Sequence, residues 1–129
     1  MAYEIPGKVI SVFNATADLS ALQYTFVSLT TLGGITGTTI VSDARVFGIL
    51  QNTPTSNQTA EVMVDGISKL VAATTAIVIG DYLGSTAGGR AVSAAYSSGT
   101  TQWVAARALS VAVTTGLCSV MVFPARIVV

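Results

Sequence analysis

The sequence predicts an all-β protein: a small single-domain β-barrel or sandwich with an extended N-terminal arm. Short runs rich in Val, Ile, Thr, Tyr and Phe recur along the chain, and Gly, Asn, Asp and Ser separate them, which is typical of strands and turns. Many short strands with frequent turns favour barrels and sandwiches, because these architectures remove or shorten exposed sheet edges. The length of 129 residues suits one domain with a single sizeable core.

The hydrophobic pattern indicates about eight to ten strands. We expect them at residues 8–13, 24–30, 45–51, 60–64, 68–72, 76–79, 91–93, 104–113 and 117–123. The clearest is 60–64, where Ala60, Val62 and Val64 alternate with Glu61 and Met63. Successive side chains of a strand point to opposite faces, so the first three are expected to face the core and the other two the solvent.

Turn signals divide these strands. Asp65-Gly66 lies between two strand-like runs, and a type I′ turn needs positive φ at both central residues, so residues 60–72 are expected to form a hairpin. Asp18 is placed to cap a short helical turn that ends at Leu22. Loops are expected at residues 33–34, 52–59, 84–89 and 97–101.

The N-terminal segment is predicted to stand apart from the barrel. Pro6 lacks a backbone donor and interrupts strand pairing, so we assign residues 1–7 to an arm able to leave the body and residues 8–129 to the barrel. An ordinary first strand that closes the barrel is the alternative for the same segment.

Composition limits the possible partners. Apolar residues make up 51% and charged residues 9%, so the chain is too apolar for a disordered protein. Its surface must therefore be covered largely by Thr, Ser, Gln, Asn and Ala, which tolerate close contact with another protein. Six basic and six acidic residues give a net charge of zero, which argues against a nucleic-acid partner.

The apolar runs also argue against a membrane location. The longest unbroken run is four residues, far short of the ~20 that span a bilayer. Glu4, Pro6 and Lys8 stand where the apolar stretch of a secretory signal would lie, so we expect the protein to fold in the cytoplasm of the cell that makes it.

Candidate catalytic groups are few. The chain has no histidine, which excludes Ser-His-Asp and Cys-His catalysis and the common zinc sites. Ser68 and Lys69 are adjacent on an expected strand, so their side chains point to opposite faces. The Cα atoms of Glu61 and Asp65 are roughly 13 Å apart on a strand, beyond the ~5 to 9.5 Å of glycosidase carboxylates. We therefore expect no enzyme activity and no catalytic residue.

The sequence supports metal, phosphate or thiol chemistry no better than it supports catalysis. Asp43, Asp65 and Asp81 lack the dense spacing of a calcium loop, and no metal ligand or cofactor is assigned. Residues 84–90 are rich in glycine but lack the Lys-Ser/Thr pair of a phosphate loop, so a hairpin loop is expected there. Cys118 is predicted to be an inert buried thiol.

Trp103, the only tryptophan, is the one aromatic candidate. Core or barrel-rim packing is the favoured interpretation. A subunit interface comes second, and a sugar-stacking platform third.

Five segments of the chain carry a family resemblance. They are ADLSALQYTFVSL (residues 17–29) with FGILQNTP (47–54), AEVMVDGISK (60–69), IGDYL (79–83) and AARAL (105–109). In this order they resemble the capsid cement, or decoration, proteins of tailed bacteriophages, over roughly residues 17–123.

The resemblance implies a small β-barrel without enzymatic activity that docks on the outside of a phage head and bridges neighbouring major capsid subunits. It also implies homotrimers at local threefold positions, made in the host cytoplasm and incorporated in the virion. The arm residues Ala2, Tyr3, Glu4 and Ile5 are then the expected capsid contacts. An extended segment can add to an exposed strand edge, and Tyr3 and Ile5 share a face at period two. The alternative is a surface-displayed glycan- or host-binding module that uses Trp103.

Overall fold

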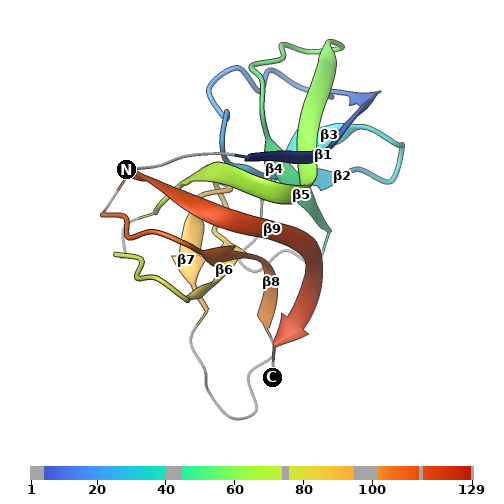
Figure 1. Cartoon of the computed structure of the whole chain (residues 1–129). Coiled ribbons are helices and arrows are strands. Elements are labelled where there is room, and N and C mark those ends of the chain that lie inside the picture. Colours follow the sequence, from blue (N-terminus) through green and yellow to red (C-terminus); the bar gives the residue numbers. More distant parts are fainter. Residues whose placement is uncertain (1–4, 40–44, 74–75, 95–101, 114, 129) are drawn as a thin grey trace.

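One antiparallel sheet of nine strands forms the protein, as a computed structural model shows (Figure 1). The structure describes residues 5–39, 45–73, 76–94, 102–113 and 115–128, and these contain no helix. The strands are β1 (Ile5–Asn14), β2 (Phe26–Leu29), β3 (Ile35–Gly37), β4 (Val46–Leu50), β5 (Thr59–Val71), β6 (Tyr82–Ser85), β7 (Ala91–Ser93), β8 (Gln102–Ala108) and β9 (Leu117–Val128). The predicted all-β class is confirmed.

The sheet curls back on itself. Its order is β3-β2-β4-β5-β9-β8-β6-β7, and β1 pairs with β5 outside this path. The far end of the path returns to the first strands, because Ala91 of β7 forms a bridge with Ala72, just after β5. In addition, the Phe26 N–H at the start of β2 donates to the Gly89 carbonyl at 2.8 Å. This curvature agrees with the predicted small barrel or sandwich.

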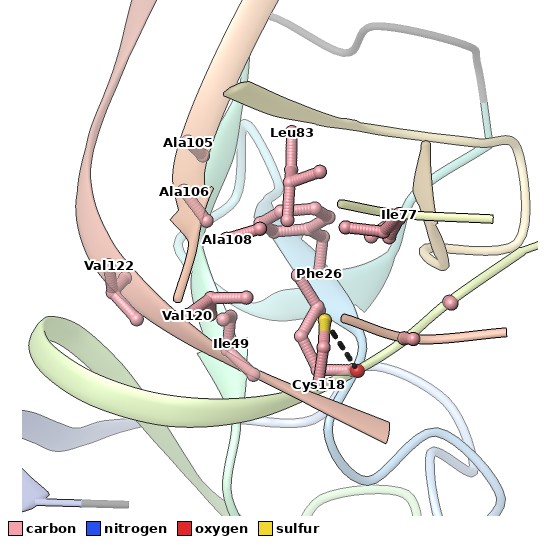
Figure 2. Packing of buried hydrophobic residues seen from close by; sticks show 14 of the residues in the cluster. Phe26, Ile49, Ile77, Leu83, Ala105, Ala106, Ala108, Cys118, Val120 and Val122 are labelled. Atoms are coloured by element: carbon pink, nitrogen blue, oxygen red, sulfur yellow. Dashed lines mark hydrogen bonds between the residues drawn. The ribbon is translucent and has the colours of Figure 1, made fainter. Parts of the chain in front are cut away.

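Two hydrophobic clusters lie on opposite faces of β2, β4 and β5. The larger fills the barrel interior (Figure 2) and includes Phe26, Ile49, Met63, Leu70, Ile77, Leu83, Cys118, Val120 and Val122. The smaller comprises Ala15, Leu19, Val27, Ile35, Leu50, Ala60 and Val62. Consecutive residues of these strands therefore enter different clusters, so this part of the sheet is buried on both faces.

Because this part of the sheet is buried on both faces, one expectation for β5, the solvent exposure of Met63, is wrong. Ala60 and Val62 are buried as predicted and Val64 is half-buried, while Glu61 is exposed. Met63, expected on the solvent face, is only 1% exposed because that face lines the barrel interior. The Val62 face is covered instead by β3 and by the segment that follows β1.

The predicted hairpin at residues 60–72 is wrong, because β5 runs through Asp65-Gly66 as one strand. Gly66 has a φ of 120° and pairs with Pro6 of β1 on one side and with Val122 of β9 on the other. Because Gly66 is paired on both edges, the chain stays extended there, and its positive φ lies within a strand and not in a turn. Opposite it, Gly7 approaches so closely that a Cβ there would lie 2.4 Å from the Asp65 carbonyl oxygen.

Residues 5–7, which were expected in the arm, belong to a strand of the sheet. The described part of β1 starts at Ile5, which pairs with Ile67. Pro6 is tolerated because β1 lies at an edge of the sheet, where one row of backbone donors is not needed for pairing. Residues 2–4 of the expected arm lie outside the described residues, so their role stays a prediction.

The remaining differences are local. The expected strand 76–79 is reduced to a single bridge between Ile77 and Ala112. No helix is assigned at residues 18–22, but a single turn closes there. The Leu22 N–H donates to the Leu19 carbonyl at 3.0 Å, and the Ser20 N–H donates to the Asp18 carboxylate at 3.0 Å, as expected for a cap. β7 matches the prediction to the residue, whereas β3 and β6 were not expected.

Candidate functional site

A row of large side chains crosses the outer face of four neighbouring strands. Tyr82 of β6 pairs with Arg107 of β8, Arg107 with Met121 of β9, and Met121 with Ile67 of β5. Directly paired residues of adjacent strands point to the same face of a sheet, so the four side chains form one continuous row. We call these residues, together with Phe123, the outer strip.

Contacts within the outer strip hold its aromatic end in place. The Arg107 guanidinium lies over the Tyr82 ring, 5.1 Å from the centroid, and its Nε donates to the Gly80 carbonyl at 3.3 Å. The Tyr82 and Phe123 rings meet edge to face with centroids 6.4 Å apart. Side chains that are already ordered lose little conformational entropy when a partner covers them.

A second group of exposed apolar side chains lies around the bridge between Ile77 and Ala112, whose own side chains are buried. We call this group, together with the first residue of β9, the end patch: Val78, Ile79, Val111, Val113 and Leu117. Met121 in the outer strip is 48% exposed and Val113 in the end patch 73%, and the fully buried Ser119 lies between Leu117 and Met121 along β9. Contiguous exposed apolar groups mark protein-interaction sites more often than isolated ones do.

The predicted capsid-contact residues adjoin the outer strip in the one position that the structure describes. Ile5 pairs with Ile67, so the backbone of β1 begins at the end of the row. Ala2, Tyr3 and Glu4 precede it and lie outside the described residues. The first described residue of β1 is therefore paired with a member of the outer strip.

Trp103 occupies a different place. It is half-buried on β8, pairs with Ile127 of β9 and lines a cavity of about 40 Å³ together with Gln102. A Cβ at Gly84 would lie 2.8 Å from the Trp103 carbonyl oxygen, so glycine allows β6 to approach β8 closely here. The structure does not bring Trp103 into the outer strip.

Among the described residues, no three or more Cys, Asp or Glu side chains are placed to share a metal ion, and Asp43 lies outside these residues. The Ser68 hydroxyl donates to the Lys69 carbonyl at 2.9 Å and accepts from Gln51 Nε2 at 2.9 Å, so both of these hydrogen bonds join parts of the protein itself.

Cys118 is fully buried, and its Sγ lies 3.5 Å from the Leu70 carbonyl oxygen. Burial raises the pKa of the thiol to about 11, which keeps it protonated and unreactive at neutral pH.

In the part of the chain that the structure describes, no helix is long and apolar enough to cross a membrane.

Sequence reasoning missed the outer strip because the strip depends on the alignment of strands that are distant in the chain. One signal was present: in residues 117–123 both alternating sets are largely apolar, and only one set can face the barrel interior. Met121 and Phe123 belong to the set left outside.

Searches against protein-family models and against curated proteins give no match to this chain.

Proposed function

We propose that this protein is a non-enzymatic capsid decoration, or cement, protein. It binds the outer surface of a phage head and stabilises the shell by bridging major capsid subunits. The family resemblance of residues 17–123 suggests this role, and the observation that supports it in the structure is the outer strip, together with the exposed apolar residues of the end patch. Contiguous exposed apolar side chains often mark surfaces that bind another protein.

The chemistry of the outer strip suits a protein partner. Tyr, Phe, Met and Arg are enriched at the centres of protein interfaces, where a few such residues supply most of the binding energy. The low charge of the chain, six basic and six acidic residues in 129, also favours a packed interface over an electrostatic one. Nucleic acid and membranes are not part of the proposal.

The position of β1 connects the outer strip with the arm. Ile5 pairs with Ile67 of the outer strip, so we propose that one partner surface contacts both this strip and the expected arm. In a shell each contact is repeated many times, so modest single contacts give a large collective stabilisation. The proposal includes a homotrimer at local threefold positions, with the end patch available for contacts between copies.

A glycan-binding module remains the alternative. It would need an open aromatic platform, whereas Trp103 is half-buried and the cavity that it lines measures about 40 Å³.

The direct test is cosedimentation of the purified protein with phage heads that lack it, followed by imaging of the decorated heads. We expect saturable binding on the outer surface and a higher disruption temperature of the heads. Met121→Glu is expected to weaken binding by about tenfold or more, since it places a carboxylate in the centre of the outer strip. Val12→Glu is the matched control, because Val12 is 79% exposed on β1 and lies outside the outer strip.

Wild-type protein that leaves the heads undecorated would exclude the proposed function. Sedimentation of the free and head-released protein tests the trimer separately.

A further inference from the structure

A cleft of about 510 Å³ lies apart from the outer strip, between three segments that are distant in the sequence. They are residues 21–25, the end of β5 as far as Ala73, and the turn 86–90. The volume falls within the range of clefts that bind specific ligands, about 300 to 1,000 Å³. Neither the resemblance nor the proposed function accounts for it.

The first wall of the cleft is held in a strained conformation. Tyr24 has a φ of 62°, which is uncommon for a residue other than glycine and costs on the order of 1 kcal/mol or more. Its N–H donates to the Leu50 carbonyl at 2.8 Å, and its own carbonyl accepts from the Val71 N–H at 2.9 Å. These bonds fix the neighbours of Tyr24 in the chain, Gln23 and Thr25, both of which line the cleft.

The opposite wall is clamped to the barrel. Gly89 has a φ of 82°, and a Cβ there would lie 2.6 Å from the Phe26 carbonyl oxygen, so this turn packs directly on β2. The Thr86 hydroxyl accepts from the Arg90 N–H at 3.2 Å, and the Thr38 hydroxyl donates to the Thr86 carbonyl at 2.8 Å. The cleft is thus preformed on both sides, which lowers the entropic cost of binding.

Arg90 gives the cleft its charge. Among the described residues that line it, Arg90 alone is ionisable, and no carboxylate of the described chain forms an ion pair with its exposed guanidinium. The other lining side chains are small, apolar or uncharged, for example Ala21, Val71 and Ala73. Small side chains leave room for a polypeptide backbone, and a guanidinium binds a carboxylate through two parallel hydrogen bonds.

We propose that this cleft binds a short extended segment of the major capsid protein, with an Asp or Glu side chain of that segment paired to Arg90. A cleft of this size accommodates roughly three or four residues. The inference rests on the proposed function, and it adds a second, charge-selective contact to the apolar contact of the outer strip. Such a contact sets the orientation of the bound protein more than its total affinity.

The test uses the same head-binding assay with variants of the cleft. Arg90→Ala is expected to weaken head binding by about tenfold or more, because it removes the proposed charge-assisted pair with a carboxylate. The affinity of this variant should also depend less on salt concentration. Arg90→Lys should retain part of the affinity because it keeps the charge. Gly88→Trp should block the cleft, since Gly88 lines it and has open space around it.

Two control variants separate the loss of the cleft contact from the effects of an added Trp side chain and of a changed net charge. Ala87→Trp adds the same side chain to the neighbouring residue, which does not line the cleft. Leu32→Glu changes the net charge by the same single unit as Arg90→Ala, at a residue that is 96% exposed in the β2–β3 turn. Both control variants should bind heads with wild-type affinity, and all variants should have the wild-type melting temperature.

Wild-type affinity and salt dependence in both Arg90→Ala and Gly88→Trp would overturn this inference and leave the proposed function intact. Failure of the wild-type protein to bind heads would instead defeat the proposed function itself.

Discussion

Replacement of Val62 by Asp tests the double-sided packing of β5. Val62 is 1% exposed within the smaller cluster, on the face opposite to Met63. Loss of its two methyl groups removes about 1.6 kcal/mol of transfer free energy. A carboxyl group without a hydrogen-bond partner adds about 1 to 3 kcal/mol.

The sum, about 3 to 5 kcal/mol, is a large part of the 5 to 15 kcal/mol by which domains are typically stable. We therefore expect Val62→Asp to be largely unfolded at 37 °C, and Val62→Ala to fold with a lower midpoint in urea. Burial disfavours the charged form, so the folded-state pKa of the introduced carboxyl should lie above its unfolded value of ~3.9.

A group whose pKa is raised in the folded state lowers the free energy of unfolding as the pH rises through that pKa. The loss of stability caused by Val62→Asp should therefore diminish as the pH is lowered toward 4. Val62→Asn has a similar shape and does not titrate, so it serves as the control. Urea denaturation of both variants at pH 4 to 8 measures the difference. A Val62→Asp protein with wild-type stability, or with the same pH dependence as Val62→Asn, would refute burial of this face.

Three further predictions concern other parts of the molecule. Gly48→Ala should lower stability by about 1 to 3 kcal/mol in urea denaturation, because its Cβ would lie 2.3 Å from the Met63 carbonyl oxygen, whereas Gly88→Ala, with open space around it, should be neutral. The thiol of Cys118 should resist alkylation in the native protein at pH 8. Its folded-state pKa of about 11 exceeds the ordinary 9.0, so its contribution to stability should be lost as the pH rises from 9 to 11, and Cys118→Ala should lack this loss. Deletion of residues 2–4 should leave the melting temperature unchanged and abolish head binding; a truncated protein that binds heads normally would rule out the arm as an anchor.

The sequence predicts those features of the fold that short-range chemistry determines. The alternation around Val62 identified a buried face, and β7 was located to the residue, since both depend on neighbours in the chain. The turn signal at Gly66 failed because it competes with pairing to β1 and β9, which no local pattern reveals. β3 and β6 are only three and four residues long and contain or adjoin glycines, so their strand signal is weak.

The candidate site was harder to predict for the same reason. The outer strip exists only because β6, β8, β9 and β5 are aligned so that Tyr82, Arg107, Met121 and Ile67 lie in one row. A shift of one residue in any of these pairings would turn a member of the row inward. The cleft likewise combines three segments that the sequence places far apart.

The two parts of the sheet suit different tasks in a protein proposed to carry load between subunits. β2, β4 and the first half of β5 are buried on both faces, and close packing on both sides resists bending. The second half of β5 pairs with β9 and brings Ile67 into the outer strip. β5 thus connects the doubly buried region directly to the proposed docking surface, and no hinge interrupts it because Gly66 is paired on both edges. A force applied at the outer strip would then pass through hydrogen-bonded strands into the region that is buried on both faces.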